Sequence, residues 1–187
     1  MKKTITFLFA LFFATSLAFS QAVEEGSKLI NLDIGLIPTF AHGKTRVPPI
    51  TASFDYLIKK IGPGTIGVGG LAGFASTREN LIVFPSGVAD PNTYFTYSYF
   101  LLGLRGTYHW FPGHSDKVDT YGGVIIGYKI VSHKYTGFEG QTVTPWGSGM
   151  LGGIFAGIRY FPSEKFGISA EVGYGVALLN IGGTFKF

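Results

Sequence analysis

The sequence contains no cysteine, which excludes disulfide-stapled scaffolds and cysteine-based metal or redox sites. Charged residues make up only 14% of the chain, about half of their share in an average soluble domain. Hydrophobic residues reach 46%, which excludes intrinsic disorder, because disorder requires low hydrophobicity and high net charge. The 28 glycines follow no three-residue period, so the chain is not collagen-like. An apolar, aromatic and glycine-rich chain of one domain's length remains.

Residues 1–20 are predicted to be a cleaved secretory signal peptide. Lys2 and Lys3 form the basic start, an apolar stretch follows over 5–17, and small residues stand near Ser20, where cleavage requires them. The alternative, a membrane-anchoring helix, needs a longer apolar run followed by basic residues. Without this leader 13 basic residues stand against 11 acidic ones, so charge gives no support for nucleic-acid binding. Residues 21–187 are predicted to form one domain.

This domain has no run of about 18 apolar residues, and its hydrophobic pattern has a period of two, which is typical of strands. Near the start, Ile30 and Leu32 alternate with Asn31 and Asp33. The same pattern recurs along the chain and predicts eight strands, at residues 28–38, 49–59, 65–76, 94–111, 118–134, 147–161, 166–175 and 177–187.

The connections between these strands alternate in length. Short turns rich in proline, glycine and charge lie at 59–64, 112–117 and 162–165, and longer segments lie at 39–48, 77–93 and 135–146. The last hairpin, near 175–178, has almost no loop. This alternation predicts an all-β fold, an eight-stranded antiparallel up-and-down transmembrane β-barrel with both termini at the short-turn end.

The polar face of the strands is predicted to line a narrow lumen. Glycine dominates it, with far fewer charges than a water-exposed face carries. The predicted lumen charge network consists of Asp33, Asp55, Arg105, Lys129, Arg159, Glu171 and Lys186. Such a network is either an ion or proton path or a plug of salt bridges, and the packed interior of small barrels favours the plug.

Aromatic residues near the strand ends predict the two interfacial girdles of a membrane barrel. Those near the short turns are Tyr108, Trp110, Phe111, Tyr160, Phe161 and Phe166. Those near the long loops are Tyr94, Phe95, Tyr97, Tyr99, Tyr135 and Trp146.

The C-terminal strand carries a resemblance to a known family. Its alternating apolar residues, Leu179, Ile181 and Phe185, lead to a terminal Phe187, and only Gly183 departs from the pattern. This ending resembles that of small outer-membrane β-barrel proteins, of the OmpX type and the OmpA-type barrel domain. The resemblance implies a location in the outer membrane of a Gram-negative bacterium and insertion by the barrel-assembly machinery through this strand. It does not specify an activity.

No catalytic residue, metal ligand or cofactor is assigned. The four histidines, at strand ends or turns, lack metal-ligand spacing: His42, His109, His114 and His133. Residues 67–70 (GVGG) lack the ending of a phosphate-binding loop and are interpreted as strand glycines that let a barrel curve.

An enzyme acting on lipid A stays open as an alternative. Its candidate residues at the outer rim are Ser132, His133, Ser148 and Glu139. Ser132 and His133 are adjacent on one strand and therefore point to opposite faces, so they cannot meet directly.

Four basic residues at the long-loop end, Lys44, Arg46, Arg78 and Lys134, suggest contact with lipopolysaccharide phosphates, and a solvated loop face is the alternative. An apolar run at 81–84 suggests a protein partner or packing over the barrel mouth. The predicted function is a non-catalytic structural or surface-interaction role for a monomer in contact with outer-membrane lipids. A narrow pore or a transporter of a small apolar ligand is the other alternative.

Overall fold

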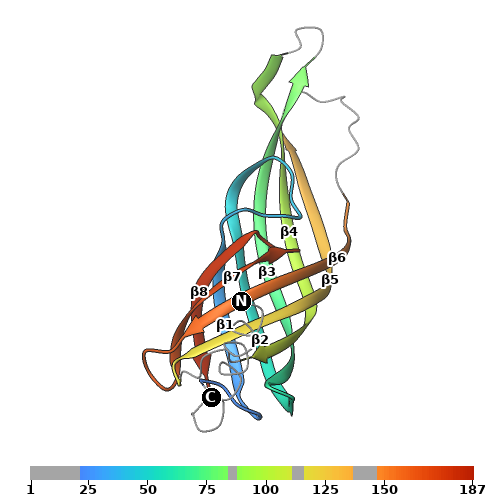
Figure 1. Ribbon diagram of the computed structural model, residues 1–187. Coiled ribbons are helices and arrows are strands. Elements are labelled where there is room, and N and C mark those ends of the chain that lie inside the picture. Colours follow the sequence, from blue (N-terminus) through green and yellow to red (C-terminus); the bar gives the residue numbers. More distant parts are fainter. Residues whose placement is uncertain (1–21, 84–87, 111–115, 137–146) are drawn as a thin grey trace, which may run out of the picture.

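The computed structural model describes residues 22–83, 88–110, 116–136 and 147–187, with side chains described except at 81–83 and 88–92. The predicted signal peptide lies outside these residues. The described chain forms eight strands in a closed barrel, in which each strand pairs antiparallel with its neighbours in the sequence and the first pairs with the last (Figure 1). In the described ranges no helix is long and apolar enough to cross a membrane.

The strands are β1 (Lys28–Gly35), β2 (Lys44–Ile61), β3 (Gly64–Val83), β4 (Val88–Trp110), β5 (Val118–Thr136), β6 (Gly149–Tyr160), β7 (Phe166–Tyr174) and β8 (Leu179–Lys186). Each falls on a predicted strand, so the predicted number, order and direction of the strands are confirmed.

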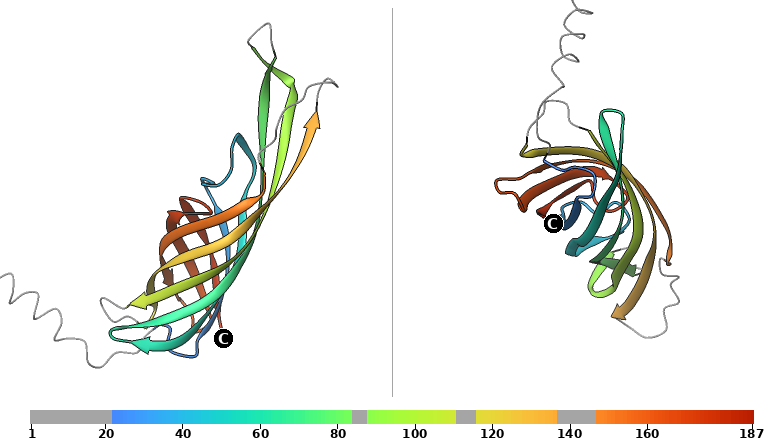
Figure 2. Two further views of the ribbon diagram at one scale, coloured as in Figure 1. Left: turned by 90° about the vertical axis from the view of Figure 1, so that its right-hand side faces the viewer. Right: turned by 90° about the horizontal axis from the view of Figure 1, so that it is seen from below.

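Two of the predicted long loops are shorter than expected. β2 begins at Lys44, and β3 and β4 extend through most of 77–93, where Asn80 pairs with Tyr94. The strands continue because each still has a neighbour to which its backbone can bond, although apolar residues no longer mark one face. One wall of the barrel, β2 to β5, therefore rises beyond the rest (Figure 2).

The outside of the barrel is an apolar band. Leu32, Leu104 and Ile154 point outward with 64%, 73% and 67% of their surface exposed. Farther along the tall wall the outward positions turn polar, as at Thr96 and Ser132. Apolar residues outside and polar groups inside are the arrangement of a transmembrane barrel, as the sequence predicts.

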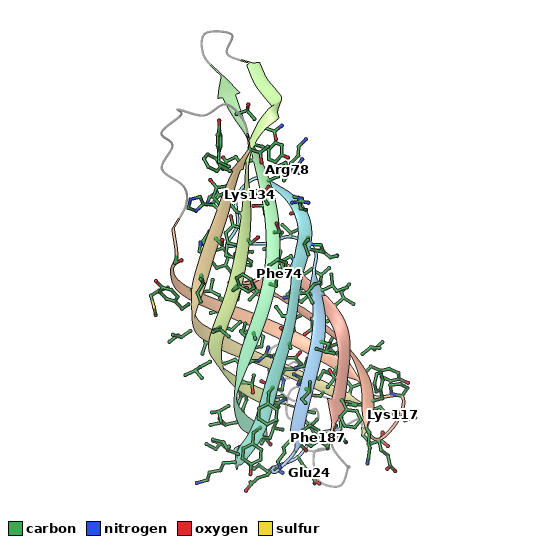
Figure 3. The ribbon with its side chains drawn as sticks, turned by 180° about the vertical axis from the view of Figure 1, so that it is seen from behind. Glu24, Phe74, Arg78, Lys117, Lys134 and Phe187 are labelled. Atoms are coloured by element: carbon green, nitrogen blue, oxygen red, sulfur yellow. The ribbon has the colours of Figure 1, made fainter. Side chains whose placement is uncertain are left out.

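The two ends of the barrel differ. At one end, here called the turn end, Glu24, Lys117 and Phe187 lie together (Figure 3). Arg78 and Lys134 lie toward the opposite end, here called the loop end (Figure 3). Both ends of the described chain are therefore at the turn end, as predicted. The β7–β8 connection at the loop end is nearly loopless and turns through Gly175, whose φ of 121° favours glycine.

Candidate functional site

The lumen is the candidate site, and side chains fill it in three layers. Charged and polar groups form an ionic layer in the middle, aromatic residues lie toward the loop end, and a small apolar cluster closes the turn end. The layers arise because inward positions recur at every second residue on all eight strands.

Arg159 of β6 is the centre of the ionic layer. Its Nη1 lies 2.8 Å from Asp119 Oδ2, and its Nη2 lies 2.8 Å from Asp55 Oδ2. Its Nε donates to Asn31 Oδ1 at 3.0 Å, and its guanidinium lies 3.8 Å from the centre of the Tyr121 ring. The side chains of Arg159, Asp55 and Asp119 are fully buried. Every face of this buried cation therefore has a partner.

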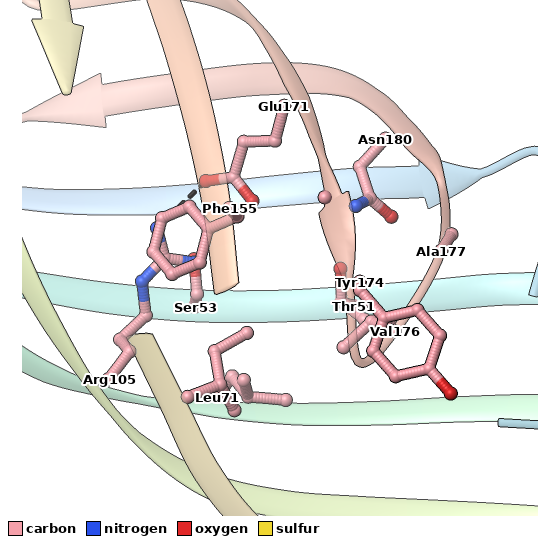
Figure 4. Close-up of a pocket in the computed structure, with 12 residues that line it drawn as sticks. Thr51, Ser53, Leu71, Arg105, Phe155, Glu171, Tyr174, Val176, Ala177 and Asn180 are labelled. Atoms are coloured by element: carbon pink, nitrogen blue, oxygen red, sulfur yellow. Dashed lines mark hydrogen bonds and ion pairs between the residues drawn. The ribbon is translucent and has the colours of Figure 1, made fainter. Parts of the chain in front are cut away.

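Arg105 of β4 extends the layer across the lumen. Its Nη2 donates to Glu171 Oε1 at 2.7 Å (Figure 4). Its Nε lies 2.8 Å from Asp55 Oδ1, so Asp55 contacts both arginines. Its Nη1 donates to Ser53 Oγ at 3.2 Å. The Tyr121 hydroxyl also donates to Glu171 Oε1, at 2.8 Å.

Ion pairs join four of the seven predicted lumen charges: Asp55, Arg105, Arg159 and Glu171. A fifth, Asp33, is buried in the lumen outside these ion pairs. Asp33 accepts a hydrogen bond from Ser169 Oγ at 2.8 Å.

Lys129 and Lys186 differ from the prediction, because neither joins the ion pairs although both point inward. Lys129 Nζ donates to the carbonyl of Phe40 at 3.1 Å, and Lys186 Nζ donates to that of Ala22 at 2.8 Å. Each lies on the expected face but toward one end of the lumen, beyond the height of the ionic layer.

Two members of the layer, Asp119 and His109, were not predicted. His109 lies next to the end of β4, as expected, and its side chain is fully buried in the lumen. Its Nδ1 lies 2.9 Å from Asp119 Oδ1 and its Nε2 lies 3.0 Å from Thr107 Oγ1. The spacing along the strands indicates the inward position of both residues. His109 lies an even number of positions from Arg105, and Asp119 lies an even number from Lys129, so each shares the face of a predicted lumen charge.

Thr107, His109 and Asp119 follow the order hydroxyl, imidazole, carboxylate of a catalytic triad. Thr107 is only 4% exposed, however, and Arg159 binds the second carboxylate oxygen of Asp119. A substrate cannot reach this hydroxyl, so the arrangement orients the histidine within the layer.

The aromatic layer corrects the predicted outer girdle. Phe95, Tyr97 and Tyr99 are buried inside the barrel, and Phe40 packs edge-on against Tyr99 with ring centres 5.4 Å apart. Their even spacing from Arg105 gives the reason, since these positions share its inward face. Phe161, predicted for the inner girdle, also points inward and is 2% exposed.

Several girdle residues do face outward at the turn end, namely Trp110, Tyr160 and Phe166. Phe111 and Trp146 lie outside the described residues, as do His114 and Glu139.

The β1–β2 connection folds over the loop end of the lumen. The Leu178 amide donates to the Ile37 carbonyl at 2.8 Å, and the Thr39 amide donates to the Val176 carbonyl at 3.1 Å. This pairing with the β7–β8 turn places Phe40 in the aromatic layer.

Between the β7–β8 turn and the ionic layer lies a cavity of about 20 Å³, lined by Ser53, Arg105, Glu171, Asn180 and Val176 among others (Figure 4). A space of this size holds about one water molecule. The cavity is therefore too small for an apolar ligand.

Of the candidate residues for a lipid A enzyme, the structure describes Ser132, His133 and Ser148. Ser132 and His133 lie on opposite faces of β5, and the ring of His133 packs against Phe95 at 6.3 Å. Ser148 Oγ accepts a hydrogen bond from the Val131 amide at 2.9 Å, which ties it to the backbone.

Three of the four predicted basic residues form a row across the tall wall, here called the cation row: Lys44, Arg78 and Lys134. Lys44 pairs with Arg78, and Thr96 lies between Arg78 and Lys134 in the same register. Arg78 stacks on Tyr94, with its guanidinium 3.8 Å from the ring centre. Figure 3 shows Arg78 and Lys134 at one level, and Arg46 is exposed on β2 nearby.

The predicted assembly strand closes the ring, because β8 pairs with both β7 and β1. Its residues Ile181, Phe185 and Phe187 lie on the outside, and Leu179 is half-buried. The apolar run at 81–84 falls in the β3–β4 hairpin, where its side chains lie outside the described part.

No family model and no curated protein matches this sequence. Among solved structures, a de novo designed transmembrane β-barrel is similar to it with a TM-score of 0.51 and 13% identity, covering 88% of this chain and 98% of that one. The crystal structure of Ail, the attachment invasion locus protein of Yersinia pestis, is similar with a TM-score of 0.50 and 15% identity, covering 88% of this chain and 100% of Ail. These likenesses confirm the predicted fold, a transmembrane β-barrel.

Proposed function

We propose that this chain is a closed, non-catalytic outer-membrane barrel that serves as a scaffold and contacts lipid phosphates at its outer rim. The observation that carries the proposal is the ionic layer, which links six strands through the lumen. Arg159 of β6 contacts β1, β2 and β5, and Arg105 of β4 contacts β2 and β7.

The layer supports a plug rather than a path. An ion-conducting lumen needs water around its charged groups, whereas both arginines here are desolvated and held by carboxylates. The apolar cluster below and the aromatic layer above separate these groups from both ends of the barrel.

Solute release from liposomes tests the closed lumen. Vesicles containing the refolded protein are expected to release a trapped small sugar no faster than protein-free vesicles. Faster release in proportion to the amount of folded protein would support the pore alternative.

The cation row supports the lipid contact. Neighbouring strands are about 4.8 Å apart, so Lys44 and Arg78 are close enough to share one phosphate, and Lys134 lies two strands farther along. The row stands beyond the apolar band toward the loop end, where headgroup phosphates would meet the barrel wall. Charge-assisted hydrogen bonds from an arginine fork and lysine amines suit this anion.

Lipopolysaccharide binding tests this contact. Replacing Lys44, Arg46, Arg78 and Lys134 with glutamine is expected to weaken binding by about tenfold or more, because several charge-assisted bonds are lost together. The matched control replaces four exposed lysines at the turn end, Lys28→Gln, Lys59→Gln, Lys60→Gln and Lys165→Gln, and is expected to bind normally. Equal affinity of both variants would show that the row is only a solvated surface.

The non-catalytic role has its own test. Overexpression of the protein is expected to leave the mass of lipid A unchanged, because Ser132 and His133 face opposite sides of β5. A new lipid A species that disappears in the variant His133→Ala would favour the enzyme alternative.

Assembly through β8 is part of the same proposal. The outward residues Ile181, Phe185 and Phe187 support it, because they present an apolar end strand to a receptor. Removal of Phe187 is expected to lower the amount of folded barrel in the membrane, and an unchanged amount would contradict this role.

A further inference from the structure

Residues 22–27, here called the N-terminal strap, fold into the turn end of the lumen. Ala22 and Val23 are each only 1% exposed, and they pack with Leu29, Leu57 and Phe161 in one apolar cluster. These few residues supply apolar cover that the strands at this end lack. The barrel wall alone would leave Leu29 and Leu57 facing the opening.

The strap is held in place by a tight turn. The Ser27 amide donates to the Glu24 carbonyl at 3.0 Å, and the Glu24 amide donates to Ser27 Oγ at 3.0 Å. Gly26 has a φ of 91°, a conformation that favours glycine. The chain therefore reverses direction between the lumen and the start of β1.

The strap also bonds to the two strands on either side of β1. On β2, the Leu57 carbonyl accepts from the Gly26 amide at 2.8 Å, and the Lys60 amide donates to Glu25 Oε2 at 3.0 Å. On β8, Lys186 Nζ donates to the Ala22 carbonyl at 2.8 Å and lies 5.3 Å from the centre of the Phe161 ring. The strap thus crosses beneath the seam at which β1 and β8 close the ring.

This seam joins two short strands. β1 and β8 contain 8 residues each, whereas β4 on the opposite wall contains 23. A short strand pair has few backbone hydrogen bonds, so the contacts of the strap contribute a larger share of the stability at this seam than they would between longer strands.

We propose that the N-terminal strap is a closing latch, which seals the turn end of the lumen against water and secures the β1–β8 seam through Lys186. Sealing keeps water from the ionic layer above, where ion pairs are stronger in a dry environment. The latch rests on the proposed closed barrel, and the two are tested by different measurements. Solute release reports on the whole lumen, whereas labelling at the turn end reports on the strap alone.

Thiol labelling in detergent micelles tests whether the strap is seated, since the protein contains no cysteine of its own. The buried Val23→Cys thiol is expected to react with a water-soluble maleimide about a hundredfold more slowly than the exposed Glu24→Cys thiol next to it. After heat unfolding the two thiols should react at similar rates. Similar rates in the folded protein, identified by its faster migration without boiling, would overturn the proposal.

A reporter above the strap tests the seal. Thr65→Cys places a thiol at an inward position of β3 that is 1% exposed. Adding Val23→Asp is expected to speed its labelling about tenfold or more, because a carboxylate does not stay in an apolar cluster. Glu24→Gln, on the exposed side of the turn, should leave the rate unchanged.

Lys186→Met provides a milder variant that removes the bond to Ala22 and keeps the aliphatic stem near Phe161. It is expected to speed labelling of the Thr65→Cys reporter to a smaller extent and to lower the temperature at which the folded band disappears. If the folded barrel keeps both the labelling rate and this temperature, the strap is not a latch.

Discussion

Arg159 shows how a single buried cation can be satisfied inside a membrane barrel. It contacts two carboxylates, one amide oxygen and one aromatic face, and all of these come from other strands. Removal of the Arg159 guanidinium would take a charged donor from each of its buried partners, Asp55 and Asp119. The sequence identifies such residues by face, because an even spacing along a strand keeps a side chain on one side. It does not identify their partners: Asp55 lies 104 positions from Arg159, and their meeting depends on the register of every intervening strand.

Arg159→Met is expected to lower the free energy of unfolding by about 3–5 kcal/mol, because it leaves Asp55 and Asp119 buried with fewer compensating charges. Urea unfolding, followed by the loss of the faster-migrating band, measures the change. Lys129→Met is the control and should cost about 1 kcal/mol, because its amine donates one hydrogen bond to a carbonyl and is only half-buried. Equal midpoints for the two variants would show that the ionic layer does not stabilise the barrel.

At the scale of strands, the alternation of apolar and polar residues predicts the part of each strand that crosses the membrane. It does not predict how far a strand continues beyond the membrane. β2, β3 and β4 continue past the apolar band, and there the backbone ladder keeps them paired although apolar residues no longer alternate. Three aromatic residues of β4 contradict the predicted outer girdle, because residue type alone does not show which face of a strand a side chain occupies. Phe95, Tyr97 and Tyr99 share the parity of Arg105 and point inward. No local sequence pattern predicts that the β1–β2 connection folds onto the β7–β8 turn, because these two segments lie far apart in the chain.

Some strand glycines allow neighbouring backbones to approach more closely than a side chain would permit. A Cβ at the inward position Gly69 would overlap the backbone carbonyl of Phe54 on β2, whereas a Cβ at the outward position Gly152 would meet nothing within 4 Å. Gly69→Ala is therefore expected to cost about 1–3 kcal/mol in urea unfolding, as overpacking does. Gly152→Ala is expected to change stability by less than about 1 kcal/mol. Comparable losses for both would mean that curvature at β3 does not depend on the missing side chain.

At the scale of the whole molecule, the apolar outside and the filled inside give one consistent account. The outward residues suit lipid, the cation row lies above them on the tall wall, and three layers of side chains occupy the lumen. The scarcity of charge in the sequence follows from this arrangement, because only a narrow layer of the interior uses charged groups. The composition and the alternation predicted the architecture, whereas the closing contacts at both ends required the three-dimensional register.

Conductance across a planar lipid bilayer tests the closed lumen most directly. The refolded wild-type barrel is expected to show no stepwise current under an applied voltage, because Arg159 and Arg105 bind across the lumen and side chains fill it above and below. Folded insertion is verified on the same sample by its heat-dependent migration. Discrete, reproducible current steps from the wild-type protein would contradict the account and identify the barrel as a pore.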